Sequence, residues 1–87
     1  MKKNYPNPFR KENIFLLILK EKSNVTIELF DENGVKIFTI LEGQELLKGK
    51  QEIKFNGNQL KSGIYKAKIC IENSHEIRLE DSSIKIN

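Results

Sequence analysis

The stretch from 24 to 41 constrains the possible folds more than any other part of the sequence. It begins with alternating polar and apolar side chains, which is the period-2 pattern of a strand with one buried face. The apolar members of this pattern are Val25, Ile27 and Leu29. Asn33-Gly34 then supplies residues that tolerate positive φ, and a second run of β-branched and aromatic residues follows at once. The sequence therefore predicts a β-hairpin, to which the rest of the chain adds further strands.

The register of this hairpin depends on the length of its turn. A two-residue turn would place Phe38 beside Leu29 and Ile40 beside Ile27. A three-residue turn with Gly34 as a bulge would instead place Ile37 beside Leu29. The two forms differ by one residue, and such a shift exchanges the faces of the strand. We favour the bulged form, because it distributes the apolar residues over the two registers less awkwardly.

The remaining runs predict an all-β protein. Further strands are expected at 14–19, 50–55, 64–71 and 77–86, with turn residues between them at fairly even spacing. Residues 42–49 are expected to connect two strands, with room for one helical turn at 45–48, and the last strand is expected to break at Asp81-Ser82-Ser83. The side chains expected to point inward are Ile53, Phe55, Tyr65, Ala67, Ile69 and Ile71, with Leu60 reaching the core from a loop. This pattern predicts an Ig-like or fibronectin III-like antiparallel β-sandwich of six or seven strands.

The run from Ile14 to Leu19 is apolar on both alternating faces. One set is Phe15, Leu17 and Leu19, and the other set is Ile14, Leu16 and Ile18. A strand in a two-layer sandwich needs only one apolar face, so something else must cover the second face. Two coverings stay open. Either the segment 5–9 folds back over it, or a protein partner binds at Ile14, Leu16 and Ile18.

The length of 87 residues is that of a single domain, which we expect to span 1–87. Residues 1–12 contain Pro6 and Pro8, which lack a backbone donor, so they predict an extended entry segment. Polar residues and prolines follow Met1-Lys2-Lys3 where a leader would be apolar. If Met1 is the native start, we expect no signal peptide in this chain.

Composition and motifs favour a non-enzymatic protein. His75 and Cys70 are the single residues of their types, which is too few for a structural zinc site and lacks the third group of a Cys–His nucleophile pair. The 15 basic and 12 acidic residues are mixed along the chain and form no basic stripe for nucleic acid. We therefore expect no cofactor, no metal, no nucleic acid and no small-molecule substrate. The expected partners are proteins, and a homo-oligomer stays open.

A series of short motifs resembles a known family. In order, they are Tyr5-Pro6-Asn7-Pro8-Phe9, Asn24-Val25-Thr26-Ile27, Phe30-Asp31-Glu32-Asn33-Gly34, Gly49 and Leu60-Lys61-Ser62-Gly63-Ile64-Tyr65. Together they resemble the type A C-terminal sorting domain of the type IX (Por) secretion system of Bacteroidetes, over about residues 4 to 86. The same pattern is similar to the related Ig-like domain of flagellar hook-capping proteins. The residues that carry the resemblance are Pro6, Asn7, Pro8, Phe9, Asp31, Gly34, Gly63 and Tyr65.

The resemblance implies a secreted or cell-surface protein whose Ig-like domain is recognised by the outer-membrane secretion machinery. Its hook-capping branch implies an alternative, a free-standing structural subunit of an extracellular, flagellar-hook-like or tail-like assembly, with the apolar outer face of the first strand as its interface. The sequence departs from the sorting pattern at Phe55, where tryptophan is usual, and at Leu16 and Ile18, where serine or threonine is usual. The resemblance also begins at residue 4, so we expect the sequence to be either a piece excised from a longer protein or a domain reused as a free-standing subunit.

Overall fold

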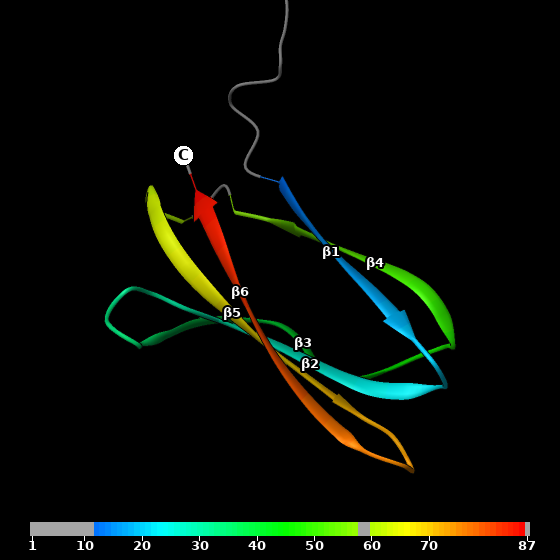
Figure 1. Ribbon diagram of the computed structural model, residues 1–87. Coiled ribbons are helices and arrows are strands. Elements are labelled where there is room, and N and C mark those ends of the chain that lie inside the picture. Colours follow the sequence, from blue (N-terminus) through cyan, green and yellow to red (C-terminus); the bar gives the residue numbers. More distant parts are fainter. Residues whose placement is uncertain (1–11, 58–59, 87) are drawn as a thin grey trace, which may run out of the picture.

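The computed structural model describes residues 12–57 and 60–86. Within them the chain forms six β-strands and no helix, which confirms the predicted all-β class (Figure 1). The strands are β1 (Glu12–Leu19), β2 (Ser23–Phe30), β3 (Lys36–Leu46), β4 (Gly49–Asn56), β5 (Gly63–Glu72) and β6 (Ile77–Ile86). Nothing in these residues is a helix able to cross a membrane. The expected entry segment 1–12 lies outside them, apart from Glu12, which begins β1.

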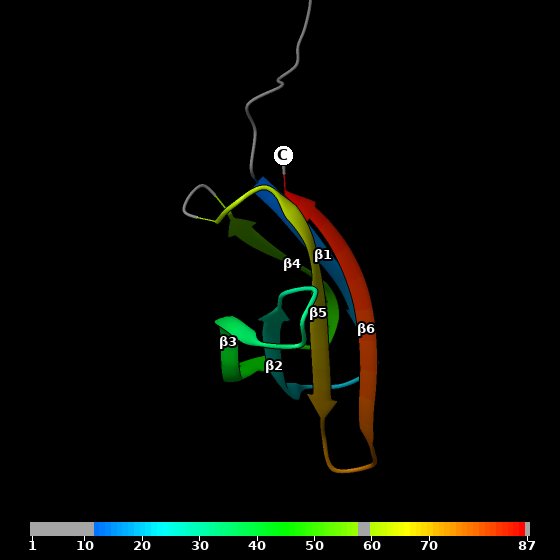
Figure 2. The same ribbon diagram turned by 90° about the vertical axis from the view of Figure 1, so that its left-hand side faces the viewer.

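The strands form two antiparallel sheets that pack face to face. The small sheet contains β1 and β4, and the large sheet has the order β3-β2-β5-β6. Figure 2 shows β1 and β4 lying against one face of the large sheet. Side chains on the facing sides form one core, which contains Phe15, Leu17, Leu19, Val25, Ile27, Leu29, Phe55, Tyr65, Ala67, Ile69, Ile71, Ile84 and Ile86. This arrangement is that of an Ig-like β-sandwich.

The predicted hairpin organises the large sheet, because β2 pairs with β3 on one side and with β5 on the other. Val25, Ile27 and Leu29 are 0% exposed. Burying each of these side chains contributes roughly 1.5–3 kcal/mol of transfer free energy. The alternation that marked this stretch in the sequence therefore reflects the most deeply buried strand of the protein.

The hairpin turn has the three-residue form that the sequence analysis favoured. The Asp31 N–H donates to the Val35 carbonyl at 3.0 Å, and the Gly34 N–H donates to the Asp31 carbonyl at 3.1 Å. Gly34 has a φ of 84°, a left-handed conformation that glycine adopts without strain. The Asp31 side chain closes the loop, because its Oδ1 accepts from the backbone N–H groups of Asn33 and Val35 at 2.8 and 3.0 Å.

The register predicted beyond this turn is wrong. Phe30 pairs with Lys36, but Leu29 pairs with Phe38 rather than with Ile37. Ile37 is an extra residue in β3, and such a bulge rotates the following side chain to the other face. Phe38 consequently reaches the inner side, where its ring centroid lies 5.7 Å from that of Phe55 on β4.

Two further expectations are corrected. Strand β3 runs on to Leu46, so residues 42–46 are strand, and no helical turn forms at 45–48. Strand β6 is continuous and keeps one register against β5, so the predicted break at Asp81-Ser82-Ser83 is wrong. The apolar residues instead change face along β6. Ile84 and Ile86 are buried, whereas Ile77 and Leu79 are 65% and 76% exposed on the opposite face.

Candidate recognition surface on the small sheet

Strand β1 places large apolar side chains on both of its faces, as its sequence pattern predicted. Phe15, Leu17 and Leu19 point into the core and are at most 7% exposed. Ile14, Leu16 and Ile18 point the other way and are 55%, 55% and 67% exposed. We call these last three side chains the outer stripe. No described residue covers it, and the covering segment considered above, 5–9, lies outside the described residues.

Charged side chains of β4 flank the outer stripe on one side. The antiparallel register places Lys54 opposite Ile14, Glu52 opposite Leu16 and Lys50 opposite Ile18. All three charged residues are exposed. An apolar centre bordered by polar and charged groups has the composition of a protein contact site, in which the centre excludes water and the rim adds specificity.

The motif that ends at Tyr65 has a structural role. Tyr65 is 8% exposed, and its hydroxyl donates to the Lys61 carbonyl oxygen at 2.7 Å. This contact, from a strand tyrosine to the backbone shortly before it, is the tyrosine corner of Ig-like sandwiches. Gly63 begins β5 with a φ of 154°, and Leu60 packs against the core as expected. The motif thus fixes the entry into β5.

The other family motif within the described residues is the hairpin turn. There Asp31 supplies the hydrogen-bond acceptor, and Gly34 adopts the left-handed backbone conformation. The two motifs border one open cavity of about 230 Å³. Pro6, Asn7, Pro8 and Phe9 lie outside the described residues. The described family residues are therefore explained by folding, and none of them lies in the outer stripe.

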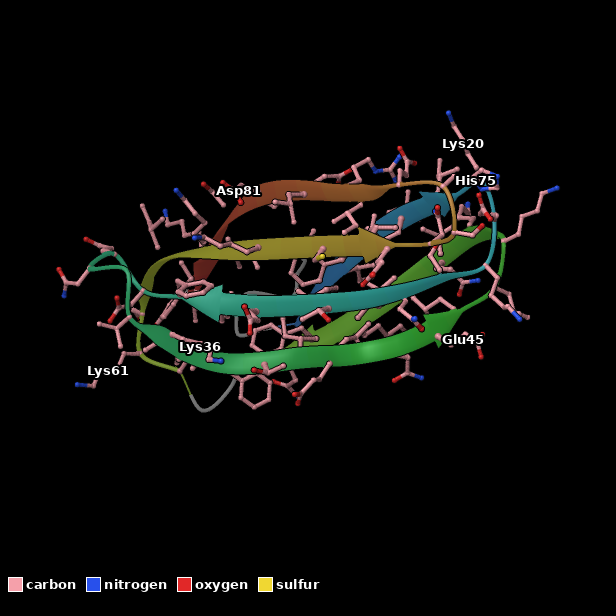
Figure 3. All side chains as sticks on the ribbon, turned by 90° about the horizontal axis from the view of Figure 1, so that it is seen from below. Lys20, Lys36, Glu45, Lys61, His75 and Asp81 are labelled. Carbon is pink, nitrogen blue, oxygen red and sulfur yellow. The ribbon has the colours of Figure 1, made fainter. Side chains whose placement is uncertain are left out.

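A polar cluster that the sequence analysis missed joins the two sheets at one end. Glu21, from the loop after β1, contacts the turn between β5 and β6 through His75 Nδ1 at 2.5 Å and Ser74 Oγ at 3.2 Å. In the same cluster, Asn73 Nδ2 donates to Ser23 Oγ at 3.2 Å. Figure 3 shows His75 beside Lys20 at this end and Lys61 at the opposite end. The contacts join residues about fifty positions apart, so no local sequence pattern predicts them.

The described residues give little support to a metal site or to a reactive cysteine or histidine. Residues 12–57 and 60–86 contain no group of three or more His, Cys, Asp or Glu side chains that could hold a metal ion. Cys70 is half-buried on the outer face of the large sheet, where it pairs with Leu79, and His75 is engaged with Glu21 and Ser74. The outer stripe, with three exposed aliphatic side chains on one strand, is therefore our candidate recognition surface.

The two packed antiparallel sheets and the tyrosine corner define an Ig-like β-sandwich. The chain matches the family model of the secretion system C-terminal sorting domain over residues 3–79. It therefore belongs to this family of type IX secretion sorting domains, which confirms that part of the resemblance. The relation to hook-capping proteins stays a prediction. No curated protein and no solved structure matched the chain. Membership of the family implies a secreted or cell-surface protein.

Proposed function

We propose that this domain is a non-enzymatic recognition module that the type IX secretion machinery binds through the outer stripe of β1. The observation that carries the proposal is the exposure of Ile14, Leu16 and Ile18 on a strand whose other face is anchored in the core. The strand cannot rotate to hide the stripe, because that would expose Phe15, Leu17 and Leu19. The apolar surface is therefore presented in a fixed orientation to a partner.

The apolar area of the outer stripe limits how much free energy the stripe can contribute to binding. Each of its three side chains is more than half exposed, so its burial by a partner would contribute about 1–2 kcal/mol and the stripe about 3–6 kcal/mol. Association costs roughly 4–15 kcal/mol in lost translational and rotational freedom. The stripe alone is thus insufficient, and the partner must also use its surroundings. The charged row of Lys50, Glu52 and Lys54 lies next to it and supplies polar contacts.

An export assay tests this proposal. The full chain is fused behind a reporter that carries its own Sec signal, in a bacterium with an intact type IX system. We expect export of the wild-type fusion, and at least tenfold less export for the double variant Leu16→Glu/Ile18→Glu. The matched control is Ile77→Glu/Leu79→Glu, which changes two exposed aliphatic residues of the other sheet and is expected to leave export unchanged. Retention of the wild-type fusion, or equal export of the stripe variant, would contradict the proposal.

The alternative role as a subunit of an extracellular assembly would use the same stripe, but the family match favours the sorting role. Light scattering of the purified chain separates the two. We expect a monomer. A stable oligomer that Leu16→Glu/Ile18→Glu converts to a folded monomer would support the subunit instead.

A further inference from the structure

We propose that the free edge of β1 accepts an additional strand from the partner, an extended segment with apolar side chains facing outward and polar side chains facing inward. This inference rests on the proposed function and specifies how the partner binds. On one side β1 pairs with β4 along its whole length. Among residues 12–57 and 60–86, no strand pairs with its other side. Figures 1 and 2 both show β6, in the other layer, on the side of β1 away from β4.

The free edge of β1 lacks the features that prevent unwanted strand pairing. From Asn13 to Leu19 it has no charged residue and no proline, and its register against β4 is uninterrupted. Exposed strand edges present unpaired N–H and C=O groups, so proteins usually protect them with charges, prolines or bulges. A regular apolar edge without protection is a site to which another chain readily adds a strand.

The other three edge strands carry such protection in the described residues. Strand β3 shifts its register three times against β2 and carries Glu42 and Glu45. Strand β4 carries the exposed charges of its Lys-Glu-Lys row. Strand β6 places Arg78, Glu80 and Asp81 along its edge. The absence of protection is thus specific to β1, which also carries the outer stripe. One partner segment would explain both observations.

The surroundings of this edge define the chemistry of the added strand. Its outward side chains would lie about 5 Å from the stripe residues in cross-strand pairs, where β-branched or aromatic groups bury apolar surface. Its inward side chains would extend toward the β6 side of the large sheet. The first half of β6 presents polar groups on its inner face, with Arg78 Nε 3.1 Å from Glu80 Oε2. Outward apolar and inward polar side chains therefore suit this position.

A second copy of β1 fits the same edge less well. Its own inward side chains, Phe15, Leu17 and Leu19, are already committed to its own core. The position beside the first half of β6 faces polar groups, which those apolar side chains would not match. The structure therefore favours a foreign segment over self-association.

Amide hydrogen exchange on the ¹⁵N-labelled full chain tests the inference. The probe is an acetylated peptide of about nine residues in which valine alternates with threonine, lysine or glutamate. Strand addition hydrogen-bonds every second amide of β1, so we expect at least tenfold slower exchange at alternating β1 amides and no change in β3, β4 or β6. The control peptide has the same sequence with alternate nitrogens methylated, which removes its donors. Protection at another edge, no protection in β1, or concentration-dependent protection of β1 without peptide would each overturn the inference.

A matched pair of variants connects the edge to export. Leu16→Lys and Leu79→Lys each place a lysine on the outward face of an edge strand at an exposed leucine. We expect Leu16→Lys to abolish the peptide-induced protection and to lower export at least tenfold, and Leu79→Lys to do neither. Normal export of Leu16→Lys, with the wild-type fusion exported, would overturn the use of the stripe and the edge inference together. Loss of export for Leu16→Lys, with no peptide-induced protection of wild-type β1, would overturn the edge inference alone. Failure of the wild-type fusion would overturn the proposed function, while the peptide experiment would still decide whether the edge accepts a strand.

Discussion

Two adjacent leucines of β1 provide a direct test of how the strand is buried. Leu17 is 5% exposed in the core, and Leu16, on the opposite face, is 55% exposed. Replacement of Leu17 by alanine removes about 2.4 kcal/mol of transfer free energy, at roughly 0.8 kcal/mol for each of the carbon groups lost, and it leaves a cavity. We expect a total loss of about 3–4 kcal/mol. Leu16→Ala loses about half of the burial and opens no enclosed cavity, so we expect a loss of about 1 kcal/mol.

The difference is large enough to measure. A typical domain of this length is stable by roughly 4–13 kcal/mol, so Leu17→Ala should remain folded in water but unfold at much lower urea concentration. The chain has no tryptophan and two tyrosines. Urea unfolding is therefore followed by far-ultraviolet circular dichroism, with tyrosine fluorescence as the second probe. Both variants should keep the wild-type dependence on urea, because the surface exposed on unfolding changes little.

Similar losses for the two variants would refute this reasoning. If Leu16→Ala cost as much as Leu17→Ala, the outer stripe would be buried within the isolated domain. That result would also remove the surface on which the proposed function rests. If both variants cost less than about 1 kcal/mol, the inward face of β1 would not be packed as the structure shows it.

Two further predictions concern the family residues that the structure assigns to folding. Tyr65→Phe removes the hydroxyl that donates to the Lys61 carbonyl at 2.7 Å, so we expect a loss of about 1–2 kcal/mol in urea unfolding, and wild-type stability would show that the tyrosine corner contributes nothing. Gly34→Ala places a Cβ on a residue with a φ of 84° in open space, so backbone strain alone should cost about 1–2 kcal/mol in the same assay. Gly34→Asn should cost less, because asparagine tolerates this conformation; an equal or larger cost would contradict the assignment to backbone strain.

The strands and their inward faces could be read from the sequence because alternation is a local property. In β2 and β5, every second residue is apolar, and these residues are the ones that the sandwich buries. The turn chemistry of Asp31 and Gly34 is also local, although the three-residue loop was favoured for the distribution of its flanking apolar residues. The double apolar pattern of β1 likewise indicated that one set of side chains would need a covering, either from the segment 5–9 or from a protein partner.

What the sequence could not determine depended on contacts between distant segments. The bulge at Ile37 brings Phe38 toward Phe55, and β4 supplies that aromatic partner from another sheet. The apolar residues of β6 change face, which looked like a break because the sequence does not show which part of the strand points into the core. Local alternation thus determined which residues each strand can bury. Only the packing of two sheets of unequal width decided which of those residues are covered, and it left the outer stripe and the free edge of β1 exposed.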